Sequence, residues 1–279
     1  TFKRLTVQVT SQFSKMIQKK TNEGTSYGGA VANYAFFQSP SSTPYNEDGS
    51  LNNGCGMFGV NPLYEFQHSS DRATIIKAFN TVKATYNIWD NLNLSEKISY
   101  DYMTNTNDVL WDRYSNNGGP GGVMQRIISK NEQLNTQTQL TYNKAFGEHN
   151  IDALLGFETE DNKYAYNYLS GQDYPGDLYE FTNAGSTSAD SNIQSYRLTS
   201  FLGRVNYDFG GKYYLSASYR TDGSSRLARD NRWGSFWSVS GAWRFTHENF
   251  MESTKEVLTD GKLRLSYGVN LSLIHISEP

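Results

Sequence analysis

Residues 201–220, FLGRVNYDFGGKYYLSASYR, alternate between apolar and polar side chains on both sides of a glycine pair. Successive side chains of a β-strand point to opposite faces, so this pattern places Val205 and Leu215 on one face and Arg204 on the other. The two glycines between the runs can supply the positive φ that tight hairpin turns need. The stretch therefore predicts a β-hairpin with one apolar and one polar face.

The same two-residue period recurs along the chain and predicts an all-β protein. Segment 73–88 is the least regular example. The nine predicted strands are residues 3–17, 73–88, 92–103, 130–146, 150–166, 196–209, 212–221, 234–246 and 261–270.

The connections between these segments alternate in length. Those at 18–72, 104–129 and 167–195 are long, that at 222–233 is of medium length, and those at 89–91, 147–149 and 210–211 are short. Only 247–260 departs from the alternation, because it is longer than a tight turn. Long loops at one end of a meander and short turns at the other are typical of outer-membrane barrels, whereas a Greek-key sandwich has no reason to alternate in this way.

The apolar face often ends in aromatic side chains near the turns. Tyr207 and Phe209 precede one turn, Tyr219 lies toward the opposite end, and Trp243 and Phe245 precede the next turn. Membrane barrels carry such aromatic girdles at both interfaces. The pattern favours a partial antiparallel transmembrane β-barrel, with a secreted β-sandwich glycan-binding module as the alternative.

Bulk composition is compatible with a barrel and gives no indication of nucleic-acid binding. The net charge is −3, and the pI is about 5.8. The mean hydropathy of −0.64 and the lack of an 18-residue apolar run predict no transmembrane helix. Barrel strands expose only every second residue to lipid, so their average hydropathy stays low.

Several longer stretches resemble the SusC/RagA family of TonB-linked outer-membrane transporters of Bacteroidetes. The most specific are RLTSFLGRVNYDFGGKYYLSASYRTDGSSRLARDNRWGSFWSVSGAWRFTHENFM (197–251) and GKLRLSYGVN (261–270). LTYNKAFGEHNIDALLGFE, TPYNEDGSLNN and NPLYEF extend the resemblance upstream. Trp237 departs from the family pattern, which usually has proline there, and this puts the local strand geometry in doubt.

The resemblance implies that residues 1–270 are part of a TonB-dependent-receptor β-barrel domain of roughly 22 strands with a plugged lumen. It implies an outer-membrane transporter without enzymatic activity or cofactor, importing glycans or peptides. Its expected partners are a SusD-like surface lipoprotein, outer-membrane lipid and TonB, the last through a region upstream of residue 1. Residues 271–279, LSLIHISEP, resemble a translated sequencing adapter and are expected to be a non-native tail.

No catalytic or metal constellation stands out. The histidines, at positions 68, 149, 247 and 275, lack metal-ligand spacing. His149 is predicted to be a solvated turn residue, and Cys55 an incidental loop thiol. Asp222 and Arg226 of the DGSSR stretch are predicted to pair and fix their loop. A cation site at YNEDGS (45–50) is a weaker hypothesis than a simple turn, because the full EF-hand pattern is missing.

Two groups of residues are candidates for contacts rather than chemistry. The predicted lumen-facing charges could contact the plug or form ion pairs along the wall; they are Arg204, Asp208, Arg220 and Arg244. The loop aromatics could stack on a ligand or pack against the lipoprotein; they are Tyr34, Phe36, Phe37, Tyr174, Tyr179 and Phe181.

Overall fold

The computed structural model describes residues 4–20, 35–36, 38–55, 59–254 and 257–269. Its strands are β1 (Leu5–Lys20), β2 (Ser69–Trp89), β3 (Leu92–Trp111), β4 (Val123–Phe146), β5 (His149–Gln172), β6 (Ser186–Phe209), β7 (Tyr213–Ser224), β8 (Trp233–Trp243) and β9 (Leu263–Gly268). The helix α2 (Pro62–His68) precedes β2, and short 3-10 turns lie at Phe181–Asn183, Arg229–Asn231, Phe245–His247 and Asn249–Thr254. The predicted tail, 271–279, lies outside the described residues.

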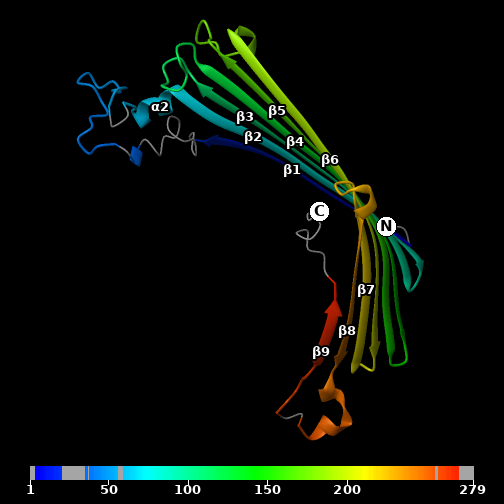
Figure 1. The fold of residues 1–279 in the computed structure, drawn as a ribbon. Helices are drawn as coiled ribbons and strands as arrows, with labels where there is room; N and C mark the ends of the chain where they lie inside the picture. Colours follow the sequence, from blue (N-terminus) through cyan, green and yellow to red (C-terminus); the bar gives the residue numbers. More distant parts are fainter. Residues whose placement is uncertain (1–3, 21–34, 37, 56–58, 255–256, 270–279) are drawn as a thin grey trace.

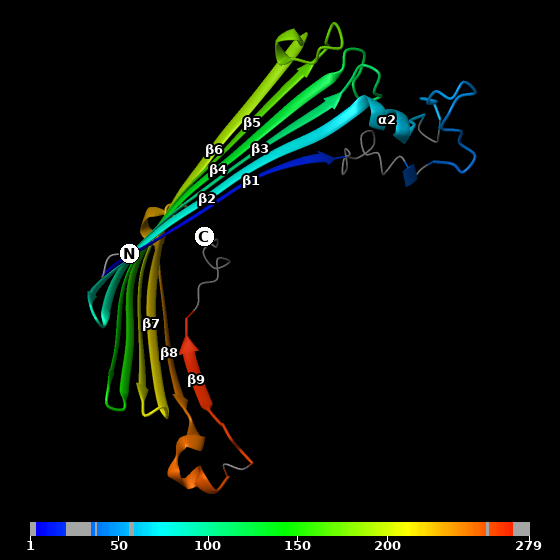
Figure 2. The ribbon, with the colours of Figure 1, turned by 180° about the vertical axis from the view of Figure 1, so that it is seen from behind.

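The nine strands form one antiparallel sheet in strict chain order, β1 to β9. Figures 1 and 2 show that this sheet is bent into a trough, with long loops at the upper end. The lower end carries the short turns and, between β8 and β9, the longer connection that departs from the alternation. The described residues form no second sheet facing the first. The predicted meander and its end-to-end asymmetry are therefore confirmed, and the sandwich is not favoured.

Strands β3 to β6 extend farther toward the upper end than the sequence pattern predicts. The loop between β3 and β4 shrinks to 112–122, and the loop between β5 and β6 to 173–185. The added residues, such as 104–108 and 190–192, are polar on both faces. They stay in the sheet because their backbone groups pair with neighbouring strands, which does not require an apolar face.

Glycine forms the β6–β7 turn as expected. Gly210 and Gly211 have φ of +59° and +65°, a region that costs glycine little and other residues more. Gly147 in the β4–β5 turn has φ of +59°. These turns fix the register so that Val205 lies directly opposite Ala217.

The two faces of the sheet differ as the alternation predicts. Val205, Leu215 and Leu265 on the convex face are 50%, 54% and 80% exposed. Apolar side chains are buried in few places among the described residues: Cys55, Val60, Ala73, Val109 and Tyr174. A single sheet without a core gains its apolar burial only from a surrounding apolar phase, so the convex face requires lipid.

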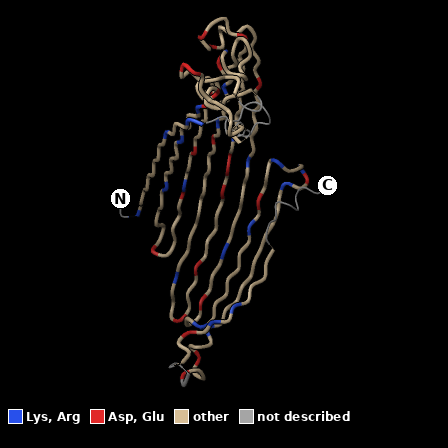
Figure 3. Tube along the Cα trace, turned by 90° about the vertical axis from the view of Figure 1, so that its left-hand side faces the viewer, with Lys and Arg blue, Asp and Glu red and all other residues tan. Residues whose placement is uncertain are grey.

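The apolar side chains of the convex face form a band. This band runs diagonally across the rows of directly paired residues on neighbouring strands, as it must in a barrel whose strands are tilted. With a tilt of about 40°, each strand step along a row changes depth by about 3 Å, and each residue along a strand by about 2.6 Å. Trp237 on β8 shares its row with Leu5 on β1, seven strands away. On β8 the upper end of the band is Trp237. On β1 the upper end is Phe13, eight residues beyond Leu5. That offset is close to the roughly eight residues that the tilt requires. Figure 3 shows the tilted strands and the acidic residues in the upper loops.

One carboxylate interrupts the convex apolar band. Glu96 lies between Leu94 and Ile98 on the convex side of β3, and it accepts a hydrogen bond from the hydroxyl of Thr138 on β4. The two residues are directly opposite in register. The alternation predicted for residues 92–103 is therefore correct for the strand as a whole but fails at this position.

Candidate functional site

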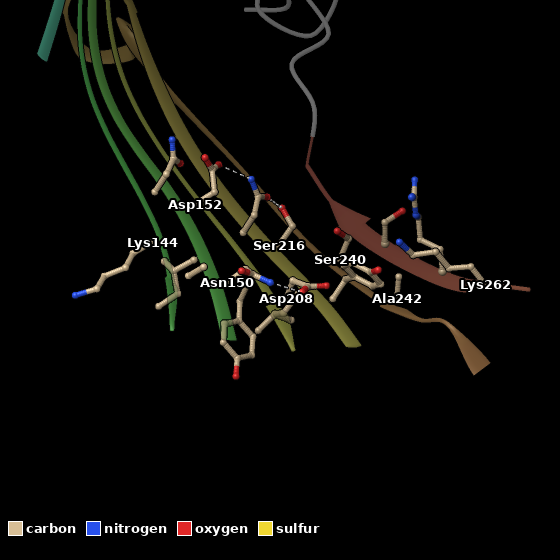
Figure 4. Close-up of a pocket in the computed structure, with 17 residues that line it drawn as sticks. Lys144, Asn150, Asp152, Asp208, Ser216, Ser240, Ala242 and Lys262 are labelled. Carbon is tan, nitrogen blue, oxygen red and sulfur yellow. Dashed lines mark hydrogen bonds between the residues drawn. The ribbon is translucent and has the colours of Figure 1, made fainter. Parts of the chain in front are cut away.

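The concave face of the lower wall carries a continuous row of polar side chains. Consecutive strands place Asp152, Asn206, Ser216, Ser240 and Ser266 directly opposite one another. The Asn206 amide donates to Asp152 Oδ1 (2.9 Å), and Ser216 Oγ donates to Asn206 Oδ1 (2.7 Å). Figure 4 shows Asp152, Ser216 and Ser240 of this row on the same side of the sheet, with Lys144 pointing away from them. Polar side chains on this face bind one another or water, not a hydrophobic core.

These residues line a hollow of about 760 Å³ formed by strands β4 to β9. Asn150 donates to Asp208 Oδ1 (2.8 Å) on its floor. On the opposite side, Lys262 Nζ lies 3.4 Å from the centre of the Tyr214 ring, a cation–π contact. The hollow thus offers hydroxyl, amide and charged groups but no nucleophile paired with a base.

Arg220 organises the middle of the concave wall. Its guanidinium contacts Glu158 (3.1 Å) and Asp222 (2.8 Å), and it donates to Ser200 Oγ (3.1 Å). The predicted Asp222–Arg226 pair is wrong, because residues two apart on a strand share a face and Arg220 takes Asp222. Arg226 instead lies over the Tyr196 ring, 3.9 Å from its centre.

The upper loops pack together into one platform. Arg113 in the β3–β4 loop donates to the Tyr174 carbonyl (2.9 Å) and pairs with Asp177 (3.1 Å) in the β5–β6 loop. Tyr179 accepts a hydrogen bond from the Arg113 backbone (2.9 Å). Tyr174 itself is only 3% exposed and meets Tyr179 edge-on. Loops fixed to each other in this way can present a defined surface at the upper rim.

A buried carboxylate attaches α2 to this platform. Glu65 is 3% exposed and accepts hydrogen bonds from Ser115 Oγ (2.8 Å) and from the Asn116 backbone and side chain (both 2.7 Å). Asn61 caps the helix by accepting from the Leu63 amide (3.0 Å). Sequence reasoning missed both residues, although asparagine followed by proline is a recognisable helix start.

Comparison with known proteins points to one group. No family model matches the chain. It is 28% identical to the TonB-dependent receptor SusC of Bacteroides thetaiotaomicron over 211 residues, 75% of this chain and 21% of that protein. It is 26% identical to TonB-dependent receptor P3 of Formosa agariphila over 259 residues, 90% of this chain and 26% of that protein. The solved structure of the RagAB peptide transporter superposes with a TM-score of 0.79 at 20% identity, covering 94% of this chain and 31% of that one.

The chain is therefore similar in sequence to TonB-dependent receptors such as SusC and similar in fold to the RagAB transporter. Its sheet has the architecture of part of an outer-membrane β-barrel. The chain spans about a quarter or less of the length of SusC and P3. These relatives are receptors rather than enzymes. Among the described residues, no helix combines the length and apolar character needed to cross a membrane.

Within this barrel wall, the four predicted lumen-facing charges have different surroundings. Arg220 and Asp208 lie on the concave face with the partners described above. Arg204 shares that face, with no ion pair to another described residue. Arg244 lies just after β8, where it contacts Asp260 (2.7 Å) and lowers the pKa of that carboxyl. Their contact with a plug stays a prediction.

The predicted loop aromatics also differ from one another. Tyr174 and Tyr179 pack inside the loop platform, and Phe181 lies beneath the Arg126 guanidinium, 5.6 Å from its ring centre. Phe36 is exposed. The other two, Tyr34 and Phe37, lie outside the described residues. A ligand or lipoprotein contact by any of these residues stays a prediction.

The remaining polar residues serve local structure. His149 is not a solvated turn residue as predicted, because it stacks on Phe146 (5.3 Å between ring centres) and its Nδ1 lies 2.6 Å from the Tyr207 hydroxyl. Asp48 of the YNEDGS turn accepts from the Ser50 hydroxyl and amide, which lowers the pKa of its carboxyl. No group of three metal-ligating residues forms among the described residues. Trp237 continues β8 without distortion of the pairing, opposite Tyr219.

Proposed function

We propose that this chain is part of a transporter that imports glycans or peptides across the outer membrane. The observation that supports it most is the separation of the two faces of one sheet. The convex face presents Val205 and Leu215 to lipid, and the concave face presents a continuous polar wall to an aqueous bore. A polar, water-lined wall conducts and orients a ligand without covalent chemistry.

In this proposal, residues 1–270 supply nine neighbouring strands of a barrel of roughly 22 strands. Strands β1 and β9 each pair with one neighbour among the described residues, so further strands must complete the wall. A plug would occupy the bore, TonB would drive its movement, and a SusD-like lipoprotein would close the upper rim. The loop platform around Glu65 and Arg113 lies at that rim and gives such a cap a fixed surface.

Uptake by whole cells tests the proposal. Cells lacking the gene for the whole receptor, and cells in which it has been restored, are given radiolabelled oligosaccharides or oligopeptides, with and without a protonophore. We expect deletion to abolish uptake of one of the two classes, restoration to recover it, and the protonophore to block it. Unchanged uptake of both classes after deletion would contradict the proposal.

Fractionation tests the alternative, a secreted glycan-binding module. A receptor with a lipid-facing convex wall stays with the outer membrane and needs detergent for extraction. Release of the full-length protein into the soluble fraction without detergent would favour the module.

A further inference from the structure

Two lysines lie directly opposite each other on the concave wall. Lys83 on β2 and Lys97 on β3 are paired in register, with Gln8 and Gln137 on either side in the same row. Like charges directly opposite each other destabilise an antiparallel pair. Neither lysine forms an ion pair or a side-chain hydrogen bond with another described residue.

The nearest carboxylate in the same row does not compensate these charges. Glu158 lies two strands from Lys97, beyond Gln137. Its oxygens are already engaged by the Gln137 amide (2.5 Å) and by Arg220 (3.1 Å). Among the described residues, the two lysines therefore lack the carboxylate partners that Arg220 has on the same wall.

Both lysines line a hollow of about 240 Å³. Every side chain of its lining is polar, and none is acidic. The lining also includes Gln8, Thr10, Ser95 and Gln139. The ammonium, amide and hydroxyl donors of this lining match a small oxyanion.

We propose that Lys83 and Lys97 form a binding site for the carboxylate or sulfate group of a ligand passing through the bore. The two ammonium groups would hold the oxyanion between them, with amide and hydroxyl donors completing its shell. The site would favour acidic over neutral ligands. It rests on the proposed function only in that this face lines an aqueous passage.

Differential lysine labelling tests the site in the full-length receptor in detergent. An amine-acylating reagent is applied in sodium sulfate or in sodium chloride of equal ionic strength, and the modification of each lysine is measured by mass spectrometry. We expect sulfate to slow labelling of Lys83 and Lys97 by about tenfold at ten times its Kd, because only about one eleventh of sites stay free. Lys77, on the same face but outside this hollow, is the control and should be unaffected. A hexuronate should protect as sulfate does, and the neutral hexose should not.

The variant Lys83→Gln should abolish the protection of Lys97, because the oxyanion needs both charges. Equal labelling in sulfate and chloride would overturn the proposal, as would equal slowing at Lys77. Resistance of both lysines to labelling in chloride would also overturn it, since another part of the receptor would then cover the hollow. None of these readouts measures uptake, so failure here leaves the transport proposal standing.

Discussion

Replacing Val205 by arginine places a charge near the middle of the lipid-facing band. On β6, Val205 lies four residues from Phe209 and four from Phe201, the aromatic residues that end the band. Four residues span about 14 Å along a strand and about 10 Å in depth at a tilt of about 40°. The band is then about 21 Å tall, close to the roughly 25 Å typical of outer-membrane barrels. We therefore expect Val205→Arg to lower the free energy of unfolding by about 2–4 kcal/mol.

Two arginine variants provide matched controls. Ser216→Arg places the same charge on the concave face, where water can solvate it, and removes one hydrogen bond to Asn206; we expect a loss of about 1 kcal/mol. Thr199→Arg stays on the convex face of β6 but lies beyond Phe201, at the interface, where the cost is about 0–1 kcal/mol.

The measurement is guanidinium unfolding of the full-length receptor in phospholipid vesicles, followed by tryptophan fluorescence. The expected order of cost is Val205→Arg well above Ser216→Arg and Thr199→Arg. Equal losses for Val205→Arg and Ser216→Arg would refute the assignment of the convex face to lipid. Equal losses for Val205→Arg and Thr199→Arg would refute the depth of the band.

Three further variants test local features. Glu96→Leu should raise the free energy of unfolding by about 1–2 kcal/mol in the same vesicle assay, because it removes a lipid-facing carboxylate; a loss would show that Glu96 has a protein or polar partner besides Thr138. Gly171→Ala should destabilise the β5–β6 loop by about 1–3 kcal/mol, because the added Cβ would lie 2.2 Å from the Tyr174 hydroxyl; protease sensitivity of the loop measures the effect. The second substitution Tyr174→Phe should restore protease resistance by removing that hydroxyl. Failure to restore it would contradict the predicted clash. Hydrogen bonds from Tyr213, Trp243 and Lys212 lower the pKa of Glu248. Their stabilisation is therefore present above the unfolded pKa of about 4.3 and is lost as the pH falls through the folded value. The protection factors of the amides at 245–251, which correct for the pH dependence of intrinsic exchange, should therefore fall in acid, and Glu248→Gln should remove that fall.

The strands and their faces could be predicted because alternation is a local signal. Val205, Leu215 and their neighbours reveal the lipid-facing side within a few residues. Strand ends could not be predicted in the same way, since residues 104–108 are polar on both faces and stay in the sheet through pairing with β2 and β4. Pairing with a distant strand leaves no trace in a local pattern.

The contacts of the candidate site were harder to predict for the same reason. Glu65 meets Ser115, 50 positions away, and Arg113 meets Tyr174, 61 positions away. Nothing local marks either pair. The Arg220–Asp222 pair is accessible from the sequence, because residues two apart on a strand share a face, and this rule favours Arg220 over Arg226 as the partner of Asp222.

The concave wall can change its chemistry without changing the fold. The sheet is held by backbone pairing and by the convex band, and neither depends on which polar groups face the bore. Glutamine at positions 83 and 97 would keep polar side chains on this face without charge repulsion, as Gln8 and Gln137 do on the neighbouring strands. Two facing ammonium groups make the sheet less stable than two amides would. A feature that costs stability and contributes nothing to pairing is best explained by what the wall must bind.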